Sequence, residues 1–318
     1  MRAEAFREWL AKAEELTPTQ RQRALEELRR ERPAPDPVAA VLGAHRACPH
    51  CHHSVCQPWG RAHGLPRFRC AACGRTFNAL TGTPLARLRQ RSCWGDYAGT
   101  LIGGQTVRAA ARRCGVHKNT AFRWRHRFLA LPAQLKPSHL HGIVEADETY
   151  FLESHKGERH LPRPPRKRGG VASKRGLSEE QIPVLVVRDR STSTTDSVLP
   201  KANTAAVSAV LGPIVDPDAV LCSDSSAIYR SFAEAAQIAH TPVNLSADIR
   251  VIDHAFHIQN VNAYHGRLKG WMARFHGVAT KYLPNYLGWR RFLERFAPSL
   301  TPALVLELAV TGQHLTRT

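Results

Sequence analysis

The sequence predicts a multidomain chain in which a small α+β region precedes a larger α/β region. Three observations predict this organisation: two cysteine pairs early in the chain, a basic helical stretch after them, and a second half in which short apolar runs end in acidic residues. With 318 residues and 43% hydrophobic content, the chain can bury cores in two or more domains.

The charge balance favours a nucleic-acid partner. The chain has 45 Lys plus Arg against 26 Asp plus Glu, and its formal charge is +19. Residues 1–16 mix charged and apolar residues and so lack the apolar core of a signal peptide. Residues 300–310 are apolar but short and contain Glu307, so we expect no membrane partner and a cytoplasmic location.

The first 35 residues are expected to form an N-terminal helical segment. Thr17-Pro18 is a start signal for its second helix. Pro33, Pro35 and Pro37 then break the helical pattern and predict a linker.

Residues 40–90 carry the pattern of a zinc ribbon. Cys48-Pro-His-Cys51 and Cys70-Ala-Ala-Cys73 are separated by 18 residues, which suits a tetrahedral zinc held by two thiolates from each hairpin. Four thiolates leave no open position on the metal, so this zinc is expected to be structural. Two incidental dithiols are the alternative. Substitution of one ligand also stays open, because other donors crowd the site: His50, His52, His53, Cys56 and His63.

Residues 91–135 predict a helix-turn-helix, most clearly over residues 106–128 with Gly115 at the turn. The positions expected to hold its helices together are Ala111, Val116, Ala121 and Trp124. The positions expected to face DNA are Lys118, Asn119, Arg123 and Arg127. A basic helical hairpin inside a larger bundle would show the same pattern.

Two acids in the second half follow apolar runs. Asp147 stands in Ile-Val-Glu-Ala-Asp-Glu-Thr-Tyr and Asp224 in Val-Leu-Cys-Ser-Asp-Ser-Ser. A buried strand delivers such an acid to its exposed end, and Mg²⁺-dependent cutting of a phosphodiester needs carboxylates that converge from distant segments. Each Asp taken alone is more often a turn or cap residue. Glu145 and Glu148 are supporting candidates, expected on the same face as Asp147 and on the opposite face respectively.

A third segment, residues 257–286, is expected to contain a helix. Its apolar face repeats at three- and four-residue spacing: Val261, Tyr264, Leu268, Met272 and Phe275. An adjacent polar face carries Asn262, His265 and Lys269. Their amide, imidazole and ammonium groups can therefore point toward one phosphate. Ordinary surface positions would explain these three residues equally well.

The remaining elements complete an alternating α/β pattern. We expect strands at 182–190 and 194–199, a helix at 204–211, a helix at 227–239 and a short strand at 240–244. Residues 154–180 are rich in Lys, Arg, Pro and Gly and are expected to form an unpacked basic loop, with Arg166, Lys167 and Arg168 near the first acid. This loop either clamps DNA or is simply solvated.

The order strand-Asp147, strand-Asp224, helix-Asn262 resembles the RNase H-like (retroviral integrase-like) catalytic domain of DDE-type transposases. Residues 257–286 are similar to bacterial insertion-sequence transposases with an N-terminal zinc ribbon, insertion sequence family 1595, ISXO-like. The resemblance covers about residues 40–290. It implies a catalytic domain over 140–290, followed by a C-terminal helical tail at 291–318.

The resemblance also implies the activity. It predicts a DNA transposase that binds terminal inverted repeats and uses Mg²⁺ or Mn²⁺, held by Asp147, Asp224 and Asn262, to cut and transfer strands. Its partners would be double-stranded transposon ends and target DNA, bound by a homodimer or higher oligomer at the bacterial nucleoid. The family usually has Glu at the third position, and Asn keeps one oxygen ligand but loses a charge. An inactive copy acting as a sequence-specific regulator, or a metal-dependent nuclease, are the alternatives.

Overall fold

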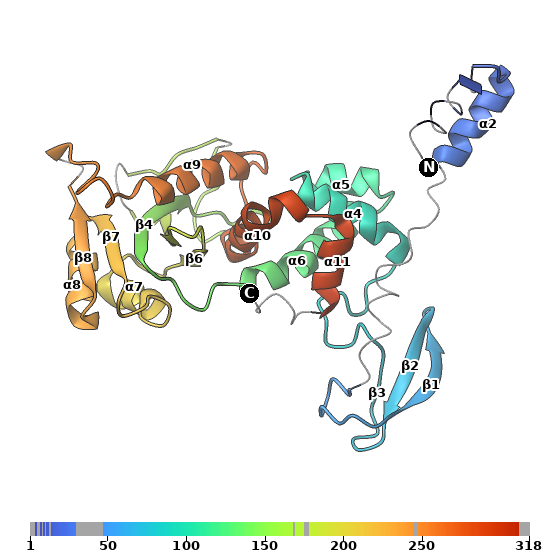
Figure 1. Ribbon diagram of the computed structural model, residues 1–318, viewed down its shortest axis with the longest axis horizontal. Coiled ribbons are helices and arrows are strands. Elements are labelled where there is room, and N and C mark those ends of the chain that lie inside the picture. Colours follow the sequence, from blue (N-terminus) through green and yellow to red (C-terminus); the bar gives the residue numbers. More distant parts are fainter. Residues whose placement is uncertain are drawn as a thin grey trace.

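The computed structural model describes residues 4, 7, 9, 11–12, 14–29, 47–167, 169–174, 178–244 and 247–311. The predicted linker prolines, residues 40–46 of the ribbon segment, Arg168 and residues 312–318 lie outside the described residues. Figure 1 shows the N-terminal helix at one end of the long axis and a five-stranded sheet at the other, with a helical region between them and the cysteine-bearing sheet below that helical region.

The N-terminal helix α2 spans Pro18–Arg29 and starts where Thr17-Pro18 predicts. The Thr17 hydroxyl accepts the Gln20 backbone N–H at 3.3 Å, and the Gln20 side chain accepts the Thr17 N–H at 2.9 Å. This reciprocal pair is a capping box, which satisfies backbone donors that the first helical turn leaves unpaired.

The cysteine-bearing region is a three-stranded antiparallel sheet in the order β1-β2-β3, with bounds Cys56–Ala62, Leu65–Cys70 and Thr76–Phe77. Phe68 and Phe77 pair across β2 and β3 with ring centroids 5.8 Å apart, and Phe77 is buried with Cys48 and Cys70. So small a core needs a further stabiliser, which agrees with the expectation of a metal between the hairpins.

The helical region begins with a short 3₁₀ turn, η1, and contains three α-helices: η1 Arg91–Cys93, α4 Trp94–Ile102, α5 Val107–Arg113 and α6 Lys118–Gln134. Gly115 has φ of +61° at the α5–α6 turn, where the sequence places the turn. Ala111, Ala121 and Trp124 are buried between the helices as expected, whereas Val116 is only partly buried.

The five-stranded sheet has the order β6-β5-β4-β7-β8. Its strands are β4 Ile143–Leu152, β5 Gln181–Asp189, β6 Thr194–Val198, β7 Val220–Asp224 and β8 Ala239–Val243. β5 runs antiparallel to β4 and β6, while β4, β7 and β8 are parallel. Helices α7 Thr204–Leu211 and α8 Ala227–Ala236 cover one face, and α9 Gln259–Ala273 covers the other (Figure 1).

Two predicted boundaries in this α/β region are wrong, one of a strand and one of a helix. Asp147 does not end its strand: β4 continues to Leu152, because its second half pairs with β5 from Asp147↔Val186 to Leu152↔Gln181. The helix expected to reach residue 239 ends at Ala236, because Gln237 adopts a left-handed conformation and β8 starts at Ala239. Asp224 is the last residue of β7, as predicted.

The C-terminal part does not begin a new unit at residue 291. Helix α10 spans Leu283–Phe296 and crosses that expected boundary, and the short 3₁₀ turns η3 Thr280–Tyr282 and η4 Ala297–Ser299 flank it. The last described helix, α11 Pro302–Thr311, packs against α4 rather than against the sheet. None of the described helices is both long and apolar enough to cross a membrane.

Helices α6 and α10 are in backbone contact. A Cβ on Gly288 would lie 2.7 Å from the Ala133 nitrogen and 2.8 Å from the Pro132 oxygen, so only glycine fits there. Arg291 donates to the carbonyls of Pro132 and Leu135 and pairs with Asp196 of β6 at 2.5 Å. One hydrophobic core therefore runs from the helical region to the α9 face of the sheet, although the sequence suggests separate domains.

Candidate functional site

The two predicted acids lie on adjacent parallel strands. Glu145 of β4 is in register with Cys222 of β7, so Asp147 and Asp224, two residues further along each strand, project side by side on the α9 face. Asp147 Oδ1 accepts the Glu148 backbone N–H at 2.9 Å, and Asp224 Oδ1 accepts the Ser226 N–H at 3.1 Å. These local bonds orient both carboxylates, that of Asp147 within β4 and that of Asp224 at the end of β7.

Like charges crowd this corner. Burial, together with the neighbouring Glu148 and Asp224 carboxylates, raises the pKa of Asp147 to about 7. Burial also raises the pKa of Glu148, which faces α8 on the other side of the sheet, beside the buried Tyr229 hydroxyl. Asp147 and Asp224, which lie side by side on the α9 face, form a place where a bound cation would be favourable.

Helix α9 brings His265 against the first acid. His265 Nδ1 lies 3.6 Å from Asp147 Oδ2, and the imidazole is 8% exposed. Burial, with the nearby Lys269 cation, lowers the pKa of His265 to about 4, so the contact at neutral pH joins a carboxyl group to an uncharged ring. The sequence places His265 on a polar face; the structure instead buries it between α9 and β4.

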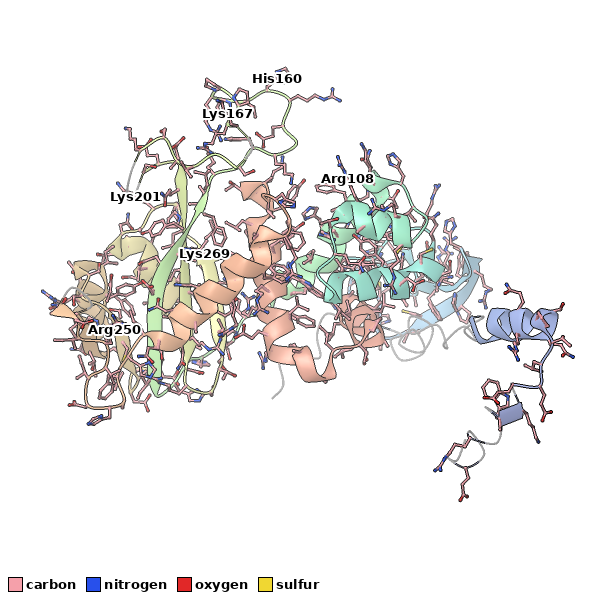
Figure 2. The ribbon with its side chains drawn as sticks, turned by 90° about the horizontal axis from the view of Figure 1, so that it is seen from above. Arg108, His160, Lys167, Lys201, Arg250 and Lys269 are labelled. Carbon is pink, nitrogen blue, oxygen red and sulfur yellow. The ribbon has the colours of Figure 1, made fainter. Side chains whose placement is uncertain are left out.

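Asn262 and Lys269 are exposed on the same side of α9 as His265 (Figure 2 labels Lys269). The Lys269 charge is near enough to oppose the rise in the Asp147 pKa. Asn262 lies one turn before His265, but within the described residues no hydrogen bond joins its amide to either acid. The structure therefore brings Asp147, Asp224, His265 and Lys269 together and leaves the Asn262 amide facing solvent nearby.

Glu145 has a different environment from the other acids. Its side chain is 1% exposed and accepts the Val261 N–H and the Asn260 amide, each at 2.9 Å, while Arg190 Nη1 lies 3.0 Å away. A carboxylate at the first turn of a helix satisfies unpaired N–H groups and the helix dipole. Glu145 thus fastens α9 to β4. Asn260 and Arg190 are functional residues that the sequence patterns do not single out, because their role depends on Glu145 being buried beneath them.

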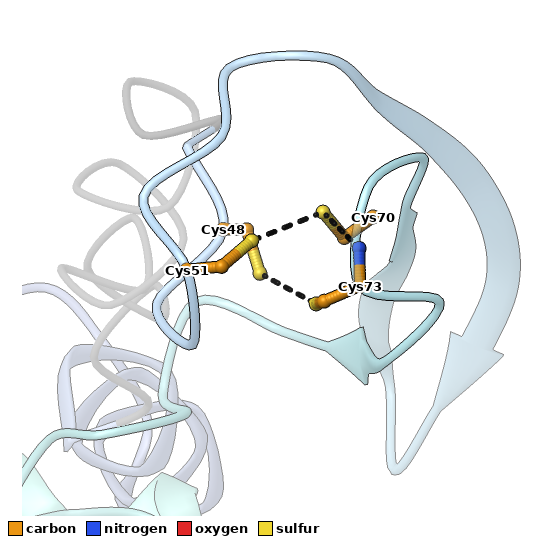
Figure 3. Close-up of side chains that lie close together, drawn as sticks. All are labelled: Cys48, Cys51, Cys70 and Cys73. Atoms are coloured by element: carbon orange, nitrogen blue, oxygen red, sulfur yellow. Dashed lines mark hydrogen bonds between the residues drawn. The ribbon is translucent and has the colours of Figure 1, made fainter.

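The four predicted cysteines converge (Figure 3). Their sulfurs all lie within 4.8 Å of one another, with Cys48–Cys73 at 3.7 Å and Cys51–Cys70 at 3.5 Å. A tetrahedron with Zn–S bonds of about 2.3 Å has S···S edges of about 3.8 Å, so the donor set fits zinc. The Cys73 N–H donated to the Cys70 sulfur helps lower the pKa of Cys70 to about 6.

Within the described residues, these cysteines are the one set of three or more potential metal-binding side chains held so closely. The neighbouring donors that could replace a ligand do not belong to the set: His50, His52, His53, Cys56 and His63. Cys56 lies beside it and donates to the His53 carbonyl at 3.7 Å.

The predicted DNA-facing residues of α6 lie on its surface: Lys118, Asn119, Arg123 and Arg127 are all exposed. In the basic loop, Lys167 is exposed, but Arg166 donates to the Glu153 carbonyl and to Glu180, each at 2.6 Å. Lys156 likewise donates to the Gly277 carbonyl at 2.8 Å. The expectation of an unpacked loop is therefore wrong at Arg166, because this side chain ties the loop to Glu153 and Glu180.

Comparisons with known proteins agree with the fold described above. Residues 139–292 match the ISXO2-like transposase domain family, and residues 98–131 match the Homeodomain-like domain family. The chain is 28% identical over 247 residues to the uncharacterised protein in transposable element ISH50 of Halobacterium salinarum, covering 76% of this chain and 82% of that relative.

Solved structures show a more distant likeness. A chain of the simian T-cell lymphotropic virus intasome in complex with PP2A regulatory subunit B56 gamma is 13% identical, with a TM-score of 0.27 over 67% of this chain and 66% of that chain. The pre-cleavage Mos1 transpososome gives 12% identity and a TM-score of 0.26 over 67% and 73%. The Mos1 mariner paired end complex with Mn gives 14% and 0.22 over 68% and 78%.

The raised pKa of Asp147 predicts a stability gain on neutralisation. A native acid with a raised pKa binds a proton as pH falls from about 7 to 4, while the unfolded chain does not, so the cost of its charge is fully present above pH 7 and absent below about pH 4. In buffer without divalent cations, Asp147→Asn should raise the free energy of unfolding by ~1–3 kcal/mol at pH 8 and by nothing at pH 4. Urea titrations at both pH values measure this, and an equal effect at both would contradict it.

Proposed function

We propose that this chain is a DNA transposase, in line with its match to the ISXO2-like transposase domain family over residues 139–292, and that Asp147, Asp224 and Asn262 form its metal-dependent site for cutting and joining DNA strands. The observation that supports this proposal most directly is the pair of acids side by side on β4 and β7, with the pKa of Asp147 raised by burial and by the neighbouring carboxylates. The fold around them fits the expected RNase H-like arrangement, in which α9 covers the acids.

In this proposal each side chain has a separate task. Asp147 and Asp224 hold the cation, and the Asn262 amide oxygen turns inward to complete its ligands. When bound, Mg²⁺ or Mn²⁺ would activate water or a 3′ hydroxyl and stabilise the leaving oxygen. His265, uncharged near neutral pH, orients the Asp147 carboxylate through its 3.6 Å contact. Lys269 offers a positive charge to the phosphate. Glu145 holds α9 in place and thereby positions His265 and Lys269.

The activity is tested with labelled DNA that carries the repeats flanking the gene, incubated with the protein and Mg²⁺ or Mn²⁺. We expect cuts at the repeat ends and joined product, both abolished in Asp224→Ala. Asn262→Ala should lower the rate by about 10- to 100-fold, and Asn262→Asp should lower the Mg²⁺ concentration needed for half-maximal rate, because it restores a negative ligand.

The products separate the alternatives. Cutting without joining would identify a nuclease, and specific binding without cutting would identify a regulator. An Asn262→Ala rate equal to that of the unchanged protein would remove Asn262 from the site.

We also propose that DNA binds across α6 and the basic loop, with double-stranded transposon ends and target held by a dimer or higher assembly. In the view of Figure 2, Arg108 of α5 and Lys167 of the loop project on the same side of the molecule. Exposed cations that contact phosphates release counter-ions on binding, so affinity falls with salt.

Single replacements measure these phosphate contacts. Arg123→Gln, Arg127→Gln and Lys167→Gln should each weaken binding and reduce the slope of log affinity against log salt by about one. Arg230→Gln is the matched control, because Arg230 is exposed on α8, on the face of the sheet away from α9. Unchanged slopes for all three variants would exclude the proposed DNA path, and an unchanged slope for Lys167→Gln alone would exclude the clamp.

The four converged cysteines are proposed to bind a structural zinc. Cys70→Ser should lose the metal measured by elemental analysis, and it should lower the melting temperature of the ribbon, because the region has few buried apolar residues. Cys56→Ser is the control: its sulfur lies beside the set but outside it, so zinc should be retained. Zinc loss in Cys56→Ser, or retention in Cys70→Ser, would overturn the ligand assignment.

A further inference from the structure

A groove of about 830 Å³ separates the helix-turn-helix from the segment that follows α9. One wall comes from the first turns of α5 and α6, and the other from residues 275–286, with Lys156 of the basic loop at its rim. Helix α9 ends at Ala273, four residues after Lys269, and the second wall follows it in the chain, so the groove is joined on one side to the helix that covers the acids.

The charge lining this groove is of one sign. Arg108, Lys118, Arg125 and Lys156 line it, and none of the lining residues is acidic. Such a surface attracts an anion, and in a DNA-binding protein the anion at hand is a backbone phosphate.

One of these cations, Arg125, is buried. Its side chain is 2% exposed, and one face of its guanidinium lies 5.5 Å from the Phe275 ring centroid. Its Nη groups donate to two neutral oxygens, the Gln105 carbonyl and the Tyr286 hydroxyl, while Nε has no hydrogen-bond partner among the described residues. Within the described residues no carboxylate pairs with it, and a buried cation without a counter-ion is costly. A phosphate in the groove would remove that cost.

Aromatic rings lie beside these cations. Phe122 is 41% exposed, and its ring centroid is 4.5 Å from that of His126 and 5.5 Å from that of Tyr282. His126 stacks on Tyr282 at 3.8 Å, and its buried Nε2 has no hydrogen-bond partner. An exposed ring next to cations is the arrangement on which proteins stack single nucleobases, because every base offers a π face.

We propose that this groove binds an unpaired nucleotide of a DNA strand, with its base on Phe122 and its phosphate toward Arg125. The inference rests on the proposed function and extends it: the strand is opened, or already single, where it passes from α6 to the acids. A paired base could not reach Phe122, because its faces are covered by its neighbours in the stack.

The test compares a labelled oligo(dT) strand with a duplex of the same length by fluorescence anisotropy. Phe122→Ala should weaken single-strand binding about tenfold and leave duplex binding within about twofold, and Phe122→Trp should restore the single-strand affinity. Trp59→Ala, which removes an exposed ring of β1 outside the groove, should not change the ratio of the two affinities. Arg108→Gln should weaken single-strand binding more than Arg112→Gln, a substitution on the same helix outside the groove.

Loss of affinity for both probes in Phe122→Ala, or for neither, would overturn the proposal. Competition by free dTMP as strong as by the oligonucleotide would assign the groove to a free nucleotide and would overturn it as well. Duplex binding and Mn²⁺-dependent cleavage by the unchanged protein report on the proposed function separately, so its failure would be seen without reference to Phe122.

Discussion

The buried carboxylate of Glu145 is the contact on which the arrangement of the acidic site depends. It lies inside β4 and holds the first turn of α9 through the Val261 N–H and the Asn260 amide. This fixes both the height and the rotation of the helix over the sheet. His265 then meets Asp147, and Lys269 lies within electrostatic reach of the same carboxyl. Glu145, two residues from Asp147, therefore acts by positioning α9, because its oxygens already bond to the first turn of α9 and to Arg190.

Within the described residues, like charges gather at two places that matter for the site. At one, burial and the neighbouring Glu148 and Asp224 carboxylates raise the pKa of Asp147; at the other, Arg125 is buried in a groove lined by further cations. By contrast, the buried Arg291 is paired with the buried Asp196. Folding alone would not favour either arrangement, since each costs stability. Both are explained if the missing partners come from outside, a cation at the first and a phosphate at the second.

Local patterns in the sequence predict what depends on neighbours along the chain. The spacing of Cys48 to Cys73, the turn at Gly115 and the strand that ends at Asp224 could all be predicted, because each is set by a few adjacent residues. The burial of His265 and the ion pair of Arg166 with Glu180 could not, because they depend on segments that meet only in the folded chain. The strand through Asp147 is extended by its pairing with β5, and the residues next to Asp147 in the sequence do not predict this long-range pairing.

The same long-range packing joins the DNA-facing helix to the acids. Gly288 lets α10 touch the backbone of α6, Arg291 links the end of α6 to β6, and α11 closes over α4. If a flexible linker joined a binding domain to a catalytic domain, the distance between the bound sequence and the cut would vary. A shared core instead holds α6 and Asp147 in one arrangement, which in the proposed function would fix how far from the bound sequence a strand is cut.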